Sequence, residues 1–293
     1  MTNELAALSD ELAAVVERAG GYVASVDARP RFYSSGVFWR PGVIVTAEHT
    51  VRREEEIAVT LADGARVAAR LAGSDPGTDI AVLRVEDSAH APIPKAGGPP
   101  KPGQIALNLG RSPDSGVNAT MGIVSAVSGV WRTWRGGRLD HYIRLDLTVY
   151  PGSSGGVVVN TAGEALGIAT SALSRIAGVA IPTVTVDRVV DEILARGRMA
   201  RGYLGVGLQR VELPDHQKGL IVLSLEPEGP AARAGLLIGD ILVSLGGVPV
   251  AETDDIQSLL ETHGVGSGIE AALVRAGAAH TLTVTVGERP RRN

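Results

Sequence analysis

The feature that most constrains the fold is a long series of short apolar runs of β type, which extends from about Gly20 to Ile181. Turn-forming residues separate the runs, and no segment of helical length and period interrupts them. Between two of the runs, Ala62-Asp63-Gly64 is predicted to form a hairpin turn. Many short strands joined by turns favour an all-β barrel or sandwich over a sheet of βαβ units. The runs are residues 43–45, 57–61, 66–69, 80–85, 122–126, 157–159 and 165–169.

The pattern changes after Pro182. Apolar residues at helical spacing predict a helix over residues 183–196, and Gly197 ends it. A second β-rich block follows over residues 203–286. A chain of 293 residues has the length of about two domains, so the change of pattern is interpreted as a domain boundary near residue 200.

Two further helices are predicted inside the second block. The first is short and covers residues 230–235, and the second covers residues 253–262 with Thr253 as its cap. The predicted organisation is an N-terminal helical segment (1–19), a first β domain (20–196), a linker (197–202), a second β domain (203–287) and a tail (288–293).

Composition argues against several functions. The formal net charge is −4, so no global positive field attracts nucleic acid or anionic lipid, and we expect no nucleic acid as a partner. The chain has no cysteine, which rules out disulfides, thiolate catalysis and cysteine-based zinc or iron–sulfur sites. We expect neither a metal nor a cofactor.

The N-terminal segment does not have the pattern of an export signal. From Asn3 to Arg18, acidic residues alternate with leucines and valines at helical spacing, which predicts an amphipathic helix. The longest uncharged stretch, residues 147–163, contains Pro151 and several glycines, so no membrane span is expected. As written, the sequence predicts a cytoplasmic protein. A periplasmic or cell-envelope location is the alternative if the sequence is a trimmed part of a longer chain.

One serine lies in a glycine-rich turn, Pro151-Gly152-Ser153-Ser154-Gly155-Gly156. A hydroxyl nucleophile for acyl transfer needs a tight turn that directs backbone N–H groups at the point where the oxyanion forms. Glycines on both sides of Ser154 permit the backbone angles of such a turn. Ordinary turns have the same composition, so this motif alone leaves both interpretations open.

A histidine and an aspartate adjoin predicted strands earlier in the chain. His49 follows the run 43–45, and Asp79 precedes the run 80–85. Serine is a poor nucleophile at neutral pH; it needs an imidazole to accept its proton and a carboxylate to orient that imidazole. His49, Asp79 and Ser154 occur in the chain order of the chymotrypsin-type barrels, and together they predict a catalytic triad.

Ordered segments along most of the chain resemble a known family. From about Val16 to Val286 the sequence resembles the HtrA (Deg) serine proteases, in which a trypsin-like domain precedes a PDZ domain. The resemblance implies a mainly β protein, with a chymotrypsin-like double β-barrel over residues 20–196 and a β-rich PDZ domain over residues 203–287. The matching segments are 35–38, 45–49, 78–85, 122–126, 146–156, 163–168 and 179–182.

The resemblance assigns roles by position. It makes Ser154 the nucleophile, His49 the general base and Asp79 the orienting carboxylate. It places the oxyanion hole at the backbone N–H groups of Gly152 and Ser154, with help from Ser153. The family usually has asparagine where this chain has Ser153, a change that backbone donors tolerate.

The resemblance also places a primary specificity pocket beside Ser154. No acidic residue lies between Leu147 and Ser154 to hold a basic side chain, so we predict cleavage after small or medium aliphatic residues. The family often has asparagine at the position of Tyr150, so the details of the pocket differ here. The alternative is that these are ordinary barrel-core residues. The expected pocket residues are Thr148, Val149, Tyr150, Thr170, Ser171 and Ala172.

In the second domain, Tyr203-Leu204-Gly205-Val206 resembles the loop by which PDZ domains bind a C-terminal carboxylate. The strand that starts at Val206 is expected to pair with the peptide. The helix that carries Ile256 and Leu260 is expected to form an apolar wall. The alternative is that these apolar residues form the domain's own core.

These features predict an ATP-independent serine endopeptidase that cleaves unfolded or misfolded polypeptides through an acyl-enzyme, with peptide binding or regulation by the PDZ domain. The alternative is a peptide-binding chaperone or adaptor with an inactive protease-like barrel. A scaffold that uses only the PDZ groove is a third interpretation.

The expected partners are unfolded or C-terminal peptide segments of other proteins. Phe32 and Tyr33 lie where the family forms trimer contacts, so a homotrimer or a multiple of it is also expected. Residues 131–138 mix tryptophan with arginine and are interpreted as a regulatory loop beside the active site, as in family members.

Overall fold

The computed structural model of the protein describes residues 3–86, 90–174, 176–214 and 216–289. The chain divides into two compact units, Met1–Met199 and Ala200–Asn293. The division falls within residues 197–202, where the sequence predicts a linker. Most of the predicted tail, residues 290–293, lies outside the described residues.

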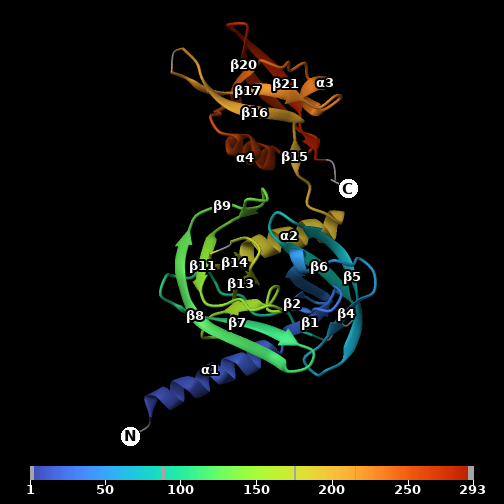
Figure 1. Ribbon diagram of the computed structural model, residues 1–293, viewed down its shortest axis with the longest axis vertical. Helices are drawn as coiled ribbons and strands as arrows, with labels where there is room; N and C mark the ends of the chain where they lie inside the picture. The colour runs from blue at the N-terminus through green and yellow to red at the C-terminus, as the bar shows by residue number, and fades with distance from the viewer. Residues whose placement is uncertain (1–2, 87–89, 175, 215, 290–293) are drawn as a thin grey trace. The chain divides into compact units, whose positions relative to one another are not determined.

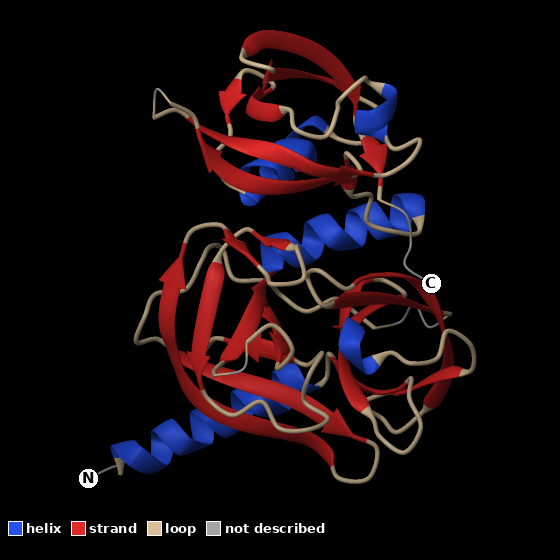
Figure 2. Ribbon diagram, turned by 45° about the horizontal axis from the view of Figure 1, so that its top comes forward, coloured by secondary structure: helices blue, strands red, loops and turns tan. Residues whose placement is uncertain are grey.

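The first barrel of the N-terminal unit is closed and antiparallel, in the strand order β1-β2-β3-β6-β5-β4 (Figures 1 and 2). The predicted hairpin at Ala62-Asp63-Gly64 is confirmed, because β4 and β5 pair directly and Gly64 has the left-handed φ of 87°. The strands are β1 (Val23–Asp27), β2 (Ser34–Arg40), β3 (Val43–Ala47), β4 (Ile57–Thr60), β5 (Arg66–Asp75) and β6 (Ile80–Val85).

The second barrel closes in the order β11-β14-β13-β12-β7-β8. A two-stranded hairpin, β9 (Trp131–Arg132) and β10 (Arg138–Leu139), lies between β8 and β11 in the chain. The predicted mainly β, chymotrypsin-like double barrel is therefore confirmed. The strands are β7 (Ile105–Ser112), β8 (Gly116–Ser128), β11 (Tyr142–Asp146), β12 (Val157–Val159), β13 (Ala165–Thr170) and β14 (Gly178–Pro182).

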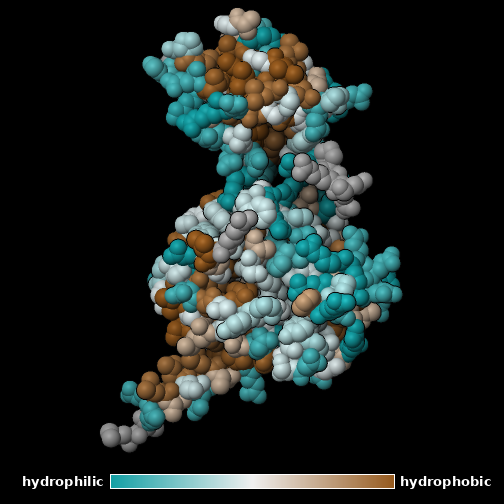
Figure 3. All heavy atoms as spheres, in the orientation of Figure 1, coloured by the Kyte–Doolittle hydropathy of each residue, from teal (hydrophilic) through white to brown (hydrophobic). Residues whose placement is uncertain are grey.

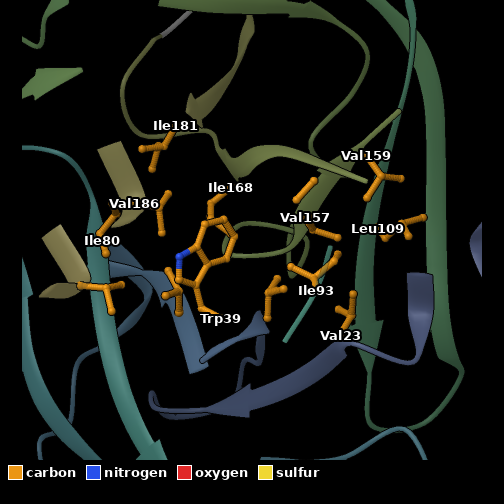
Figure 4. Packing of buried hydrophobic residues seen from close by; sticks show 14 of the residues in the cluster. Val23, Trp39, Ile80, Ile93, Leu109, Val157, Val159, Ile168, Ile181 and Val186 are labelled. Carbon is orange, nitrogen blue, oxygen red and sulfur yellow. The ribbon is translucent and has the colours of Figure 1, made fainter. Parts of the chain in front are cut away.

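The largest apolar core contains residues from both barrels. Figure 4 shows Trp39 of the first barrel packed near Val157 and Ile168 of the second. Several strands are buried on both faces: Val43 and Val45 belong to this shared core, whereas Ile44 belongs to a second cluster made only of first-barrel residues. Burial on both faces explains why the sequence of such a strand is an unbroken apolar run.

Two helices pack on the N-terminal unit. α1 (Glu4–Gly20) buries Val15 and Ala19 in the shared core. Its first half exposes Leu5 and Leu8, and apolar atoms follow its length in Figure 3. Within the described ranges, no helix is long and apolar enough to cross a bilayer.

α2 (Thr183–Arg196) is the helix predicted after Pro182. It buries Val186, Val189 and Ile193, and its C-cap Gly197 has a left-handed φ of 73°. Val184 of the same helix is 51% exposed.

The C-terminal unit is built on a sheet in which β16 is an edge strand, in the order β16-β17-β18-β20-β21 with β19 paired to β18. The predicted cap of α4 is wrong: the N-cap is Glu252, whose side chain forms a capping box with Asp255, and Thr253 is the first helical residue. The elements are β15 (Gly202–Tyr203), β16 (Val206–Glu212), β17 (Lys218–Leu225), α3 (Pro230–Arg233), β18 (Ile241–Leu245), β19 (Val248–Pro249), α4 (Thr253–His263), β20 (Gly268–Arg275), β21 (Ala278–Thr285) and β22 (Gly287–Glu288).

Candidate active site

His49 and Asp79 meet at the ends of two neighbouring strands. β3 leads into a short 3-10 turn (Glu48–Thr50) that carries His49, and Asp79 directly precedes β6. The register of β3 and β6 places Ala47 opposite Ile80. His49 Nδ1 lies 3.0 Å and 2.9 Å from the two carboxylate oxygens of Asp79, and the His49 backbone N–H donates to Oδ1 at 2.9 Å.

Asp79 is fully buried and its carboxylate is held from several sides. Its φ of 60° is left-handed, a conformation that aspartate tolerates better than most residues. The hydroxyl of Thr170 donates to Asp79 Oδ2. Thr170, expected in the specificity pocket, therefore contacts the acid. The hydrogen bonds compensate for burying a carboxylate.

Ser154 lies in a turn whose backbone requires glycine. Gly152 and Gly155 have left-handed φ values of 92° and 85°. A Cβ atom at Gly155 would lie 2.2 Å from the Ser35 carbonyl oxygen and 2.5 Å from Thr46 Oγ1. The turn therefore packs against β3 at Thr46, which lies three residues before His49 in the chain.

Ser154 Oγ lies 3.1 Å from Ser171 Oγ. No hydrogen bond joins Ser154 to His49 among the residues that the structure describes. Thr170 contacts Asp79 and its neighbour Ser171 contacts Ser154, so two consecutive residues connect the acid with the serine. The structure thus joins His49 with Asp79 and brings Ser154 to the same site, with its hydroxyl turned toward Ser171.

The backbone N–H groups of the turn differ in their partners. Ser153 N–H donates to the Tyr150 carbonyl at 2.9 Å and is not free for an oxyanion. This contact is a reason to leave Ser153 out of the expected oxyanion hole. The N–H groups of Gly152 and Ser154 have no acceptor in the described part of the chain.

A cavity adjoins Ser154 through Ser171. Of the expected pocket residues, Val149, Ser171 and Ala172 line it; Thr148 and Thr170 do not, and Tyr150 is 58% exposed. No charged side chain lies among the described lining residues. The lining is completed by Trp134, Ser174, Ala177 and Gly178.

Trp134 comes from the hairpin β9–β10 and was not expected in the pocket. Its indole N–H donates to the Ala172 carbonyl at 3.4 Å, and its side chain is 71% exposed. The tryptophan and arginine residues of this segment mark it in the sequence as unusual. The local sequence does not indicate which surface they contact.

The same hairpin also contacts the segments that carry Asp79 and His49. Thr133 Oγ1 donates to the Gly77 carbonyl at 2.7 Å, and Arg135 forms an ion pair with Glu48 at 3.4 Å. Burial and the nearby Asp79 raise the pKa of Glu48, and Arg135 partly offsets this. Glu48 was not singled out in the sequence, although it adjoins His49.

In the C-terminal unit, the loop before β16 presents backbone donors. Gly205 has a φ of 75°, and the carbonyls of Leu204 and Gly205 accept N–H groups of Ala231 and Glu226, both at 2.8 Å. The N–H groups of Leu204 and Gly205 have no acceptor within the described ranges. Burial and a hydrogen bond to Glu226 raise the pKa of Tyr203.

The edge strand β16 begins at Val206 directly after this loop. Ile256 and Leu260 of α4 are each 5% exposed and belong to the apolar core of the unit, with Val206 packed against it. Over the whole described chain, no cluster of three or more histidine, aspartate or glutamate side chains could hold a metal ion.

The fold and the site define a trypsin-like peptidase barrel followed by a PDZ domain. Residues 34–168 match the family described as trypsin-like peptidase domain, and residues 202–286 match the PDZ domain family. Together the matches include all three residues of the predicted triad and the whole edge strand β16.

Two curated relatives illustrate the similarity. Serine endoprotease DegS of Escherichia coli (strain K12) is 31% identical over 281 residues, which cover 90% of this chain and 79% of DegS. A probable periplasmic serine endoprotease DegP-like of Pseudomonas savastanoi pv. phaseolicola is 34% identical over 263 residues, which cover 85% of this chain and 54% of the relative. The chain spans about half the length of its DegP-like relatives.

Solved structures agree with these relatives. The serine endoprotease from Yersinia pestis has a TM-score of 0.81 and 31% identity, with 95% of this chain and 98% of that chain covered. HtrA-type protease AlgW with decapeptide has a TM-score of 0.81 and 28% identity, with 96% and 99% covered. The chain belongs to the HtrA (Deg) family of serine endoproteases, as the sequence predicted.

Proposed function

We propose that this protein is an ATP-independent serine endopeptidase that cleaves unfolded or misfolded polypeptides through an acyl-enzyme. The observation that carries the proposal is the His49–Asp79 pair beside a glycine turn that holds Ser154. Membership of a family whose relatives are named serine endoproteases supports it.

The proposed mechanism begins with a rotation of the Ser154 hydroxyl from Ser171 toward His49. Asp79 accepts a hydrogen bond from the N–H at His49 Nδ1 without taking the proton, and Nε2 is then free to take the hydroxyl proton as Ser154 Oγ attacks the substrate carbonyl. The N–H groups of Gly152 and Ser154 stabilise the oxyanion.

Collapse of the tetrahedral intermediate breaks the C–N bond, and His49 gives its proton to the leaving amine. The acyl group remains on Ser154. A water molecule then attacks the acyl carbon while His49 takes its proton. The bond between the acyl carbon and Ser154 Oγ breaks, His49 gives that proton to Oγ, and the carboxylic acid leaves.

For substrate choice, we propose small or medium aliphatic residues before the scissile bond. The uncharged lining of the cavity beside Ser171, which includes Val149, Ala172 and Trp134, supports this preference. A tryptophan in the wall leaves less room for a large side chain.

The PDZ domain is proposed to bind C-terminal peptide segments along the open edge of β16, with the loop at Leu204 and Gly205 holding the carboxylate. The family's AlgW structures with a decapeptide and a tripeptide support a peptide ligand.

A homotrimer or a multiple of it is proposed as the assembly, supported by Phe32, which is 64% exposed. Light scattering that gives the mass of one chain would contradict it.

The DegP-like relatives are named periplasmic, which supports a cell-envelope location for this protein. Fractionation of the source cells tests this location against the cytoplasm.

The function is tested by labelling with a fluorophosphonate probe and by digestion of casein. The wild-type protein should label and digest, and Ser154→Ala should do neither while it remains folded. A matched control is Ser115→Ala, a serine in the turn between β7 and β8. Peptide binding without labelling of the wild type would favour the chaperone or adaptor.

A further inference from the structure

Ser35 is a fully buried serine of β2 that contacts the nucleophile turn on two sides. Its backbone N–H donates to the Ser154 carbonyl at 3.1 Å, and its hydroxyl donates to the Gly152 carbonyl at 2.8 Å. The Ser35 carbonyl in turn accepts the hydroxyl of Thr46 at 2.6 Å. Ser35 thus connects β2 and β3 to both residues of the proposed oxyanion hole.

The direction of the Ser35 hydroxyl bond is determined by its other partner. The backbone N–H of Arg111 donates to Ser35 Oγ at 2.9 Å, so this oxygen accepts there. A serine hydroxyl has a single proton, and the Gly152 carbonyl is an acceptor only. The proton therefore points at Gly152, and the two bonds polarise each other.

Arg111 is itself held in place, because its guanidinium donates to the carbonyls of Val23 at 2.5 Å and Gly20 at 2.8 Å. Gly20 is the last residue of α1. Burial lowers the pKa of Arg111, and the two carbonyl acceptors compensate for part of the cost of burying it. The anchor of Ser35 is therefore rigid on the side opposite the turn.

The bond to Gly152 helps to hold a peptide next to a residue of wide conformational freedom. Glycine has the widest choice of backbone angles, and Gly152 already has a φ of 92°. The carbonyl of the Gly152–Ser153 peptide is held by Ser35, and its N–H is held by the Tyr150 carbonyl. This held peptide lies between the two peptides that carry the N–H donors of Gly152 and Ser154, so it restrains the direction of both.

We propose that Ser35 is a positioning residue that fixes the oxyanion hole by holding the carbonyls of Gly152 and Ser154. This inference rests on the proposed function, because it assigns a role in the same reaction. Ser35 touches neither substrate nor reacting atoms, so it acts through the two N–H donors. Donors aimed in advance at a developing charge lower the barrier without changing how the substrate binds.

The test compares Ser35→Ala with the wild type by the concentration dependence of fluorophosphonate labelling and by casein digestion. The maximal labelling rate and the digestion rate should both fall about ten- to a hundredfold, since loss of a whole oxyanion donor costs about a hundred- to a thousandfold. The half-saturating probe concentration and the midpoint of the pH profile should stay unchanged, because the pocket and His49 are untouched.

Ser34→Ala is the matched control. Ser34 is also buried in β2, but its hydroxyl forms a hydrogen bond with the Thr50 hydroxyl at 3.0 Å and has no hydrogen bond to the turn among the described residues. In thermal melts Ser34→Ala should lose about as much stability as Ser35→Ala, but its labelling rate should stay that of the wild type. Equal losses of labelling rate in Ser34→Ala and Ser35→Ala would overturn the inference.

Ser35→Cys covers the case in which the alanine variant does not fold. Its thiol has a similar shape but is a weak hydrogen-bond donor. The labelling rate of Ser35→Cys should therefore lie between that of the wild type and the lower rate expected for Ser35→Ala. A folded Ser35→Cys or Ser35→Ala that labels at the wild-type rate would overturn the inference. A wild-type protein that does not label at all would instead refute the proposed function, and with it any role of Ser35 in that reaction.

Discussion

Among single residues, Asp79 has the most unusual surroundings in the proposed site. It has no exposed surface and a left-handed backbone, yet it accepts hydrogen bonds from His49 and Thr170. A carboxylate buried in this way selects one orientation and one tautomer of the imidazole, with the proton on Nδ1. The other ring nitrogen is then left as the proton acceptor.

The first prediction concerns the protonation of His49. Because an imidazolium cannot accept the Ser154 proton, casein digestion should fall as the pH is lowered from about 8 to about 5. Initial rates across this range measure the effect. Circular dichroism at each pH shows that the fold is intact, and a flat profile with an intact fold would contradict the role of His49.

Among the structural elements, α2 contacts the first barrel through the carboxylate of Asp187. Asp187 accepts the indole N–H of the fully buried Trp39 at 2.9 Å and the Lys95 ammonium at 2.6 Å, and it forms an ion pair with Arg40 at 3.0 Å. Because Trp39 lies in the core shared by the barrels, this contact ties the helix to the scaffold of the site.

We therefore predict that Asp187→Ala lowers the free energy of unfolding by about 2 kcal/mol, because it leaves the buried indole N–H without an acceptor. Urea unfolding followed by tryptophan fluorescence measures the change. Asp191→Ala is the control: this residue of the same helix pairs with Arg40 and its side chain is 66% exposed, so its effect should stay within about 0.5 kcal/mol. Equal effects of the two substitutions would contradict the argument.

For the whole molecule, the two units have separate apolar cores. Among the residues that the structure describes, the core of the C-terminal unit is built from residues from Leu204 onward, and the other cores are built from residues of the N-terminal unit. Within it, the buried Asp240 accepts two hydrogen bonds from Arg275, both at 2.7 Å. The pKa of Asp240 is lowered, chiefly by this bond to Arg275 and further by the Leu237 N–H.

This pair predicts a pH dependence confined to the C-terminal unit. A lowered pKa in the folded state means that the unfolded state binds the proton more readily. The stabilisation is present above the usual pKa range of an aspartate and is lost as the pH falls through the lowered pKa. Asp240→Asn should lower the free energy of unfolding of this unit by about 2 kcal/mol at neutral pH, and by less in acid.

Thermal scans that resolve the unfolding of the two units test this prediction. The transition of the C-terminal unit should move down, and that of the barrels should not. A shift of both transitions by the same amount would contradict the separation of the cores. Asp254→Asn is a control on the same unit, since this aspartate is exposed on the first turn of α4.

Some strands of the barrels were recognised from the sequence and others were not. The continuous apolar run from Val43 to Val45 was recognised as a strand, and it lies in β3. β11 was not among the predicted runs, because the buried Ile143 and Leu145 alternate with the exposed Arg144 and Asp146. A period of two over five residues is a weak signal, and only barrel closure makes it a strand.

By itself the sequence determined an all-β first domain, a second β-rich block and the chain order of His49, Asp79 and Ser154, because strand propensity and turn chemistry are local properties of the chain. The double barrel and the PDZ domain were implied by the resemblance to the HtrA (Deg) family. The tertiary structure decided the partners. It placed Thr170 on Asp79 rather than in the pocket, Trp134 in the pocket wall, and the Ser154 hydroxyl against Ser171. Thr170 and Asp79 are 91 residues apart in the chain, and closing the second barrel beside the first is what fixes the direction of both side chains.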